Sequence, residues 1–475
     1  MVKKLVGLTM VGALSFSLAA CGSSDSGSAT AESEAEATET TEEVSTEETE
    51  TSTETEEAAA EGTTTDGDSV SGTYDIFITG YDWGAGVNEV TLNLDSTLDS
   101  VSAEDFAVTE TKQTTDWTSE NFDIIETTVD RQVTDAYFVD ADGNKSEDPT
   151  ENVKLELYVS PNDGSPFLFS MTTQFNTYSN PYYLTITSSD SAAFSLDIAQ
   201  EYVNKETSAD NWSVDSYEAT DGVKYDYAYF NPETDTDTLV VWLHGMGEGG
   251  TTDTDPYVTI LANKVTALAS DEFQSTVGGA YVVAPQCPTY WMDNDGQMGN
   301  LATGIGADGT SFYLNSLEEF IDSYAEKVGA EKIVIAGCSN GGFMTMLLSL
   351  SRPDAYACAV PICEALSDEL ISDEGINSLM DLPMYFIYSE DDTTVDPTVF
   401  EIPTIERLKA AGKTSDTLHV STTESVIDTS GQYTDEEGNP YQYMGHWSWI
   451  YFDNNESVCN DDGLTAWDFI AESVK

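Results

Sequence analysis

The fold follows from residues 333–344, which read Ile333-Val334-Ile335-Ala336-Gly337-Cys338-Ser339-Asn340-Gly341-Gly342-Phe343-Met344. The apolar run at 333–336 is typical of a strand buried on both faces, and a helix-forming run follows Ser339. Small residues two before and two after a serine allow the sharp strand-to-helix turn that exposes its hydroxyl. The helix start also favours developing negative charge. The stretch therefore predicts a nucleophilic Ser339; a glycine-rich turn that Ser339 merely caps is the alternative.

Other apolar runs surround this motif and extend the pattern over residues 206–475. Continuous apolar segments at 239–243, 280–284 and 384–388 indicate further strands of a sheet buried on both faces. Residues 214–218 and 224–230 resemble two paired strands, and residues 312–328 carry the apolar stripe of a helix. Residues 464–474 should form the last helix, capped by Asp461 or Asp462. This alternation predicts an α/β domain with a mostly parallel sheet.

A serine hydroxyl needs a base, and the sequence has only three histidines. His446 lies in a loop before the last helix, which fits the order serine, acid, histidine of α/β-hydrolases. His419 lies within an alternating strand that would hide or misdirect it, so it is the second choice. His244 follows an early strand, where a structural role in holding a loop suits it better than a catalytic one.

The acid should follow a strand that lies between Ser339 and His446. Residues 383–388 are that strand, and they run into Ser389-Glu390-Asp391-Asp392-Thr393-Thr394-Val395-Asp396-Pro397. The Asp-x-x-Val spacing resembles the acid loop of the α/β-hydrolase superfamily and selects Asp392, whose role would be to orient the imidazole. Asp396 separates Val395 from Pro397, unlike the usual pattern of this loop, so Asp391 stays an alternative.

Two backbone N–H groups should stabilise the developing oxyanion. One is expected from Asn340, the residue after the nucleophile. The other is expected from the loop His244-Gly245-Met246-Gly247-Glu248, at Met246, because the glycines of this loop permit a close approach.

Residues 1–200 divide into three segments. Lys3 and Lys4 precede an apolar run that ends in Leu18-Ala19-Ala20-Cys21, so residues 1–20 read as a signal peptide. Residues 21–72 are acidic, rich in Ser, Thr and Glu, and without aromatic residues, which predicts a disordered tether. Residues 73–200 alternate with period two and contain turn signals, which favours an all-β, immunoglobulin-like sandwich. The run 140–144 is expected to be a plain turn between two of its strands.

Three resemblances add to this interpretation. The tetrad ending at Cys21 resembles the lipobox of bacterial lipoproteins; this implies cleavage before Cys21, a lipid on its thiol and a location on the outer face of the cell membrane. An ordinary signal peptide is the alternative. The run Tyr81-Asp82-Trp83-Gly84 resembles the start of the immunoglobulin-like domain that precedes the catalytic domain of some bacterial esterases.

The third resemblance covers residues 206–475. The motifs Leu-His-Gly-x-Gly-Glu, Gly-x-Ser-Asn-Gly-Gly and Gly-His-Trp-Ser-Trp, with the loop 284–288 and Trp291, resemble esterases and predicted peptidases related to the prolyl oligopeptidase family. The resemblance implies carboxylester hydrolysis through an acyl-serine, without a cofactor. A serine peptidase is the alternative, although the β-propeller of true prolyl oligopeptidases is missing. A surface-binding protein without turnover is a further alternative. Trp291, Trp447 and Trp449 could line a site for polysaccharide-linked esters or be buried in the core.

Charge and cysteine content limit the partners. The formal net charge is −71, and much of it lies beyond the tether, which argues against binding to nucleic acid. Of six cysteines, five remain after Cys21, and the sequence does not assign disulfides. No Cys-x-x-Cys pair is present, so no metal site is expected. The expected partners are a small or polysaccharide-linked ester and, through Cys21, a membrane.

Overall fold

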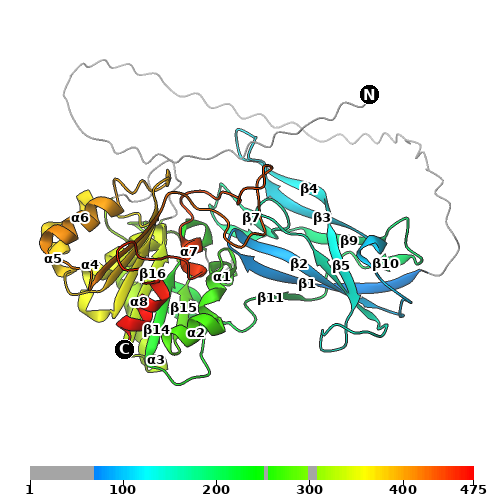
Figure 1. Cartoon of the computed structure of the whole chain (residues 1–475), viewed down its shortest axis with the longest axis horizontal. Helices are drawn as coiled ribbons and strands as arrows, with labels where there is room; N and C mark the ends of the chain where they lie inside the picture. Colours follow the sequence, from blue (N-terminus) through cyan, green and yellow to red (C-terminus); the bar gives the residue numbers. More distant parts are fainter. Residues whose placement is uncertain (1–68, 251–254, 298–307) are drawn as a thin grey trace, which may run out of the picture. The chain divides into compact units, whose positions relative to one another are not determined.

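A mixed sheet of eight strands carries Ser339 (Figure 1). The computed structural model describes residues 69–250, 255–297 and 308–475, and within these ranges the strand order is β12-β13-β15-β14-β16-β17-β18-β19. The strands β14 to β19 run parallel, whereas β12 and β13 pair antiparallel. Their bounds are β12 Ser213–Glu218, β13 Lys224–Phe230, β14 Thr238–Leu243, β15 Tyr281–Pro285, β16 Lys332–Cys338, β17 Cys358–Ile362, β18 Met384–Ser389 and β19 Leu418–Thr423.

Helices cover this sheet because the central strands are buried on both faces; every residue of β14, β17 and β18 is buried. The helices are α1 Val258–Leu261, α2 Asp271–Val277, α3 Leu314–Val328, α4 Asn340–Ser351, α5 Asp373–Ser378, α6 Glu401–Ala411, α7 Trp449–Asp453 and α8 Ala466–Ser473. The predicted α/β class is confirmed, with the expected pairing of β12 with β13 and the expected helix α3.

The start of the last helix differs from the prediction. The cap of α8 is Thr465, whose Oγ1 accepts the N–H of Asp468 at 3.2 Å. Asp462 was one of the two expected caps, but its Oδ1 accepts the N–H of Leu464 at 3.0 Å. A threonine directly before the helix makes the same bond as an aspartate, so the acidic pair upstream was misleading.

Residues 70–207 form the predicted all-β part, which contains a six-stranded and a three-stranded sheet. In the larger sheet the order is β10-β1-β2-β6-β5 with β11 also on β1, and in the smaller sheet it is β4-β3-β9. The bounds are β1 Val70–Tyr81, β2 Gly84–Leu94, β3 Phe106–Thr115, β4 Ile124–Arg131, β5 Val133–Phe138, β6 Asn152–Leu157, β7 Phe167–Phe169, β8 Asn176–Tyr178, β9 Tyr182–Ser188, β10 Leu196–Ile198 and β11 Lys205–Thr207.

The edges of this sandwich lie outside the range 73–200 that the sequence indicates. The strand β1 starts at Val70, inside the segment expected to be tether, and β11 ends at Thr207. The expected turn at 140–144 lies between β5 and β6, where Asp140 Oδ1 accepts the N–H groups of Asp142 and Asn144. The rest of the expected tether and the signal peptide lie outside the described residues.

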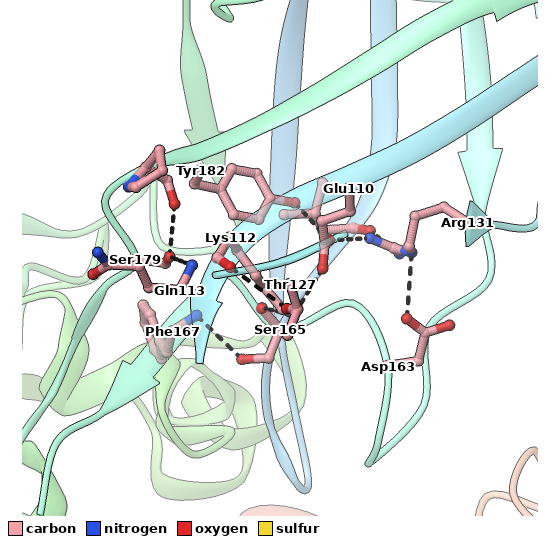
Figure 2. Close-up of polar contacts among 12 residues, drawn as sticks. Glu110, Lys112, Gln113, Thr127, Arg131, Asp163, Ser165, Phe167, Ser179 and Tyr182 are labelled. Carbon is pink, nitrogen blue, oxygen red and sulfur yellow. Dashed lines mark hydrogen bonds and ion pairs between the residues drawn. The ribbon is translucent and has the colours of Figure 1, made fainter. Parts of the chain in front are cut away.

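A buried ionic cluster links the two sheets of the sandwich (Figure 2). Arg131, at the end of β4, donates to Glu110 of β3 at 2.6 Å, and both side chains are fully buried. Its Nη2 also donates to the carbonyl of Val87, on the opposite sheet, and to that of Tyr158, each at 2.9 Å. Lys112 Nζ lies 2.7 Å from the other oxygen of Glu110. The guanidinium therefore joins β3, β4 and β2.

The sandwich and the hydrolase part share one apolar core, and the described residues from 69 to 475 form a single compact unit. The turn 81–84 contributes to their contact: Asp82 accepts from Asn454 Nδ2 at 3.0 Å and lies 3.5 Å from Lys264 Nζ. Trp83 packs edge-on against Tyr433. The polar and aromatic residues of this turn between β1 and β2 therefore contact the hydrolase part.

Two further findings concern the described residues alone. Cys287, Cys338, Cys358, Cys363 and Cys459 are all buried and free. Among the helices described, none has the length and apolar character needed to cross a membrane.

Candidate active site

Ser339 stands at the turn between β16 and α4, at the carboxyl end of the parallel strands. Its backbone has φ 55° and ψ −117°, a conformation that a non-glycine residue rarely adopts. A Cβ on Gly337 would lie 2.7 Å from the carbonyl oxygens of Leu243 and Gly341, and one on Gly341 would overlap the carbonyl of Leu243. The two glycines of Gly-x-Ser-x-Gly are therefore required by direct backbone contact, which holds Ser339 on the bend.

Ser339, His446 and Asp392 form one hydrogen-bonded chain. The Ser339 hydroxyl donates to His446 Nε2 at 2.9 Å, and His446 Nδ1 donates to Asp392 Oδ2 at 2.7 Å. The other oxygen of Asp392 accepts the N–H groups of Thr394 and Val395 at 2.8 and 2.9 Å. The carboxylate is thus fixed in orientation, and it selects the histidine tautomer whose Nε2 is free to accept a proton.

Asp391, the alternative acid, points elsewhere. Its Oδ1 accepts from the Ser389 hydroxyl at 2.6 Å, and its Oδ2 accepts from Gln442 Nε2 at 3.3 Å. A Cβ on Gly445 would overlap the Asp391 carboxylate. Asp391 therefore holds the loop that carries His446 and does not contact the imidazole.

The loop expected to bind an oxyanion lies against the serine turn. Gly245 packs beside Cys338, with a would-be Cβ 3.7 Å from its sulfur, and Met246–Glu248 form a short 3-10 turn. Asn340 is the first residue of α4, and its side chain accepts the N–H of Met292 at 2.9 Å. The two expected oxyanion donors, Met246 and Asn340, thus lie on segments that flank Ser339.

His244 holds this loop in place. Its Nδ1 donates to the Gly245 carbonyl at 2.6 Å, while its Nε2 accepts the N–H of Cys287 at 2.9 Å. Complete burial lowers the pKa of His244 to about 4, so the ring is neutral. Its hydrogen bonds are those of a structural histidine.

The other residues considered in the sequence lie away from Ser339 or in the core. His419 is in β19 and stacks on Tyr385. Trp291 is fully buried against His244 and Tyr225. Trp449 is buried and meets the His446 ring edge-on, whereas Trp447 is only half-buried.

Buried carboxyl groups behind the site were not found from the sequence. Glu364, two residues after β17, and Glu401, the first residue of α6, are both fully buried. Burial raises the pKa of Glu364 to about 8. Burial, and then the charges of Glu364 and Asp392, raise the pKa of Glu401 well above its ordinary value. An acid at the end of an apolar run was the available signal for Glu364.

A further buried acid, Glu248, lies in the loop beside Ser339. Burial raises its pKa to about 7, although hydrogen bonds from Asn176 and from backbone N–H groups of the loop oppose this. Asn176 belongs to β8 of the sandwich and donates to Glu248 Oε1 at 3.4 Å. Gln174, in the turn between β7 and β8, also contacts the hydrolase part, since its Oε1 accepts from the Tyr290 hydroxyl at 2.8 Å. The β7–β8 region of the sandwich therefore contacts the loop that carries Glu248.

Comparison with known proteins gives a family match for each of the two folded parts. Residues 73–193 match the family described as "Esterase Ig-like N-terminal domain", and residues 227–430 match the family described as "Phospholipase/Carboxylesterase". A comparison with curated protein sequences found no match. The solved structures include a thermostable esterase with a TM-score of 0.61 and 21% identity, covering 81% of this chain and 96% of that one. A ferulic acid esterase matches with a TM-score of 0.39 and 12% identity, covering 55% and 98%.

The matches confirm an esterase-type immunoglobulin-like domain followed by an α/β-hydrolase domain of phospholipase/carboxylesterase type. The chain is an enzyme, a serine hydrolase with esterase activity of the α/β-hydrolase family. The matched family is a carboxylesterase family, and none of these findings supports the expected kinship with peptidases.

Proposed function

We propose that the chain hydrolyses carboxylic esters through an acyl intermediate on Ser339. The observation that carries this proposal is the continuous hydrogen-bonded chain from Ser339 Oγ through His446 to Asp392, at 2.9 and 2.7 Å. A serine next to an imidazole that a carboxylate orients is an activated nucleophile.

In this mechanism Ser339 Oγ attacks the ester carbonyl carbon and its proton passes to His446 Nε2. The carbonyl oxygen becomes an oxyanion, which the N–H groups of Met246 and Asn340 stabilise. The bond to the alcohol oxygen then breaks as His446 returns the proton to that oxygen. A water molecule repeats the sequence on the acyl-serine, releases the carboxylic acid and restores the Ser339 hydroxyl. Asp392 stabilises the imidazolium in both halves.

Hydrolysis of a short-chain nitrophenyl ester tests the proposal. Ser339→Ala should lower kcat by roughly 10⁴-fold or more and should abolish labelling by a fluorophosphonate probe. Ser275→Ala is the control, because Ser275 is exposed on α2 and bonds only the Glu272 carbonyl. Labelling of Ser339→Ala at the wild-type level would overturn the assignment. Wild-type protein that takes up no probe would indicate a binding protein, and faster cleavage of a proline-containing peptide than of the ester would indicate a peptidase.

We further propose acyl groups linked to polysaccharides as the substrate class. Trp447 supports this proposal, because it is half-buried, follows His446 directly and lies 6.1 Å from the Trp449 ring, so its exposed part could stack on a sugar. Trp447→Ala should raise KM for an acetylated oligosaccharide more than for a nitrophenyl ester. Equal effects on both substrates would contradict the proposal.

We also propose that a lipid on Cys21 anchors the enzyme to the outer face of the cell membrane. The basic start, the apolar run and the tetrad ending at Cys21 support this proposal. Wild-type protein expressed in a bacterium should incorporate labelled fatty acid and sediment with membranes, whereas Cys21→Ala should do neither. Equal fractionation of the two proteins would contradict it.

A further inference from the structure

A second cluster of ligating side chains lies at the amino end of β19. It consists of His419 on this strand with Cys459 and Asp462 from the loop before α8. Ser339 follows the carboxyl end of the parallel strand β16, so the two sites lie at opposite ends of the sheet. None of the three side chains takes part in the hydrogen-bonded chain at Ser339.

The ligating atoms of this cluster converge. His419 Nδ1 lies 3.2 Å from Asp462 Oδ2, and all three atoms, including Cys459 Sγ, lie within 4.8 Å of one another. His419 is 6% exposed and Cys459 is 3% exposed. His419 Nδ1 is buried, and its partner among the described residues is the Asp462 carboxylate, in an ion pair. An imidazole nitrogen, a carboxylate and a thiol gathered this closely are groups that one metal ion can share as ligands.

The chemistry of the three groups selects the partner. Imidazole nitrogen, cysteine sulfur and carboxylate oxygen together are typical ligands of Zn²⁺, whereas Ca²⁺ and Mg²⁺ prefer oxygen alone. Zinc bonds of about 2.0–2.3 Å place neighbouring ligand atoms roughly 3.3–3.8 Å apart. The separation of 3.2 Å between His419 Nδ1 and Asp462 Oδ2 is near this value, and the Cys459 sulfur lies within 4.8 Å of these groups.

The backbone holds the ligands in position. The loop closes on itself through the N–H of Cys459 on the Leu464 carbonyl at 2.8 Å and the N–H of Gly463 on the Cys459 carbonyl at 3.0 Å. Gly463 has φ 79°, which favours glycine. The N–H of Asn460 bonds the Val420 carbonyl at 2.9 Å and ties the loop to β19.

A polar hollow of about 450 Å³ lies against two members of the cluster, His419 and Asp462. Asp416, Asp468 and Glu472 line it together with His419 and Asp462. Their negative charges attract a cation, and the hollow admits water as a further ligand.

We propose that His419 Nδ1, Cys459 Sγ and Asp462 Oδ2 bind one Zn²⁺ ion, with a water from the hollow as fourth ligand. The ion fastens the 459–464 loop to β19 and thereby stabilises the C-terminal end of the fold. Sequence spacing could not reveal this site, since His419 is far from the other two ligands along the chain.

Metal binding to the full chain tests this proposal. Protein stripped with a chelator under reducing conditions should bind one equivalent of Zn²⁺ in competition with a chromophoric chelator, and bind Ca²⁺ and Mg²⁺ far more weakly. Co²⁺ should produce the near-ultraviolet charge-transfer band of a thiolate ligand. Zinc should raise Tm while leaving ester hydrolysis unchanged, so the outcome does not depend on the proposed function.

Three variants sharpen the test. Cys459→Ala should lose the Co²⁺ band, and both it and His419→Gln should bind Zn²⁺ at least about 100-fold more weakly, because loss of an outer-shell partner alone costs about 10–100-fold. Asp461→Asn is the control, since Asp461 is exposed in the same loop and is no ligand. The proposal is overturned if the wild type binds no stoichiometric zinc, if Ca²⁺ binds as tightly, or if Cys459→Ala keeps the band. Circular dichroism and ester hydrolysis verify folding of each variant.

Discussion

Ser339 has an unfavourable backbone conformation because the backbone segments packed around it fix the course of the chain. Strain of this kind costs about 1–3 kcal/mol and persists only where the surrounding packing imposes it. Here the packing is backbone against backbone, with Gly337 and Gly341 pressed on the carbonyl of Leu243. The same contacts place the loop that follows β14 beside the hydroxyl, so one set of glycines positions both the nucleophile and the proposed oxyanion donors.

Gly341→Ala should therefore inactivate the enzyme and destabilise it. The new Cβ would overlap the Leu243 carbonyl, which is backbone and cannot rotate away, so the serine turn must shift. We expect kcat for a nitrophenyl ester to fall by roughly 10²-fold or more and the free energy of unfolding by about 1–3 kcal/mol. Gly375→Ala is the control, because its Cβ would meet side-chain atoms and no backbone: Leu350 Cδ2 at 3.1 Å, Ile371 Cγ2 at 3.3 Å and Ser372 Oγ at 3.6 Å. Near-wild-type kcat in Gly341→Ala would show that the turn relaxes.

Glu364 should make stability depend on pH. Its pKa is raised from 4.5 to about 8 by burial, so the folded chain keeps a proton that the unfolded chain releases. The unfolded state binds fewer protons between about pH 4.5 and 8, and wild-type stability therefore falls as the pH rises through this range. After burial, the hydrogen bond from the Leu366 N–H lowers the pKa of Glu364 and the charge of Asp368 raises it.

Glu364→Gln removes this proton release and can keep the acceptor for the N–H of Leu366. In urea unfolding, its stability relative to wild type should be about 1–3 kcal/mol greater near pH 8 than near pH 5. Glu406→Gln, an exposed change on α6, should show no such trend. A constant difference between Glu364→Gln and wild type across this range would mean that Glu364 is ionised in the folded state.

At the level of single residues, the sequence predicts a good part of the active site. The order of Ser339, Asp392 and His446 along the chain identified the three side chains that the structure brings together. The choice between Asp391 and Asp392 required coordinates, because adjacent residues on one loop differ only in direction. The burial of Glu364 and Glu401 was not predicted, since it depends mainly on tertiary packing; the apolar run before Glu364 was the local signal.

Among the elements, strands with continuous apolar runs were predictable and β17 was not. Its sequence Cys358-Ala359-Val360-Pro361-Ile362 contains a proline, which lacks the N–H of a sheet ladder and argues against a central strand. The structure nevertheless pairs Pro361 with Gly337 beside the serine turn. Tertiary pairing on both sides thus overrides a local signal where the site is built.

The buried cluster of the sandwich gives a prediction about elements. Arg131→Met leaves the Glu110 carboxylate buried without its main partner, so that Lys112 and the Tyr182 hydroxyl are left to contact it. Breaking a buried pair on one side costs about 3–5 kcal/mol, so the urea midpoint should fall sharply. Lys145→Ala is the control, because Lys145 and Asp135 form an exposed pair 3.6 Å apart, worth less than about 1 kcal/mol. Equal losses in the two variants would indicate that solvent screens the cluster.

On the scale of the whole molecule, the sandwich and the hydrolase part act as one body. Their apolar cores are continuous, and β11 returns to pair with β1 after the point where the sequence pattern changes. That pairing joins residues far apart in sequence, so the boundary near residue 200 could not be read from periodicity. The contact also reaches the active-site loop, where a would-be Cβ on Gly247 meets Asn176 Nδ2 at 2.8 Å.

Asn176→Ala, a change in the sandwich, should therefore lower kcat of the hydrolase part. The variant loses the hydrogen bond to Glu248 Oε1 and opens space beside Gly247, so the loop that carries Met246 is less well placed. We expect kcat to fall roughly 5- to 10-fold with KM little changed, as for loss of an interaction made in the transition state. The bond favours the charged form of Glu248, whose pKa is about 7, so its loss should also move an inflection of the kcat profile to higher pH.

Glu248→Gln should remove that inflection, which separates the effect on the loop from a general loss of folding. Asn162→Ala is the matched control, because Asn162 is exposed in a turn of the same sandwich. Unfolding midpoints of Asn176→Ala and Asn162→Ala should stay close to wild type, since each of these changes touches at most one side-chain hydrogen bond of modest strength, worth about 0.5–1.5 kcal/mol. A wild-type kcat and pH profile in Asn176→Ala would show that the hydrolase part holds its own oxyanion loop and that the sandwich contributes only to stability.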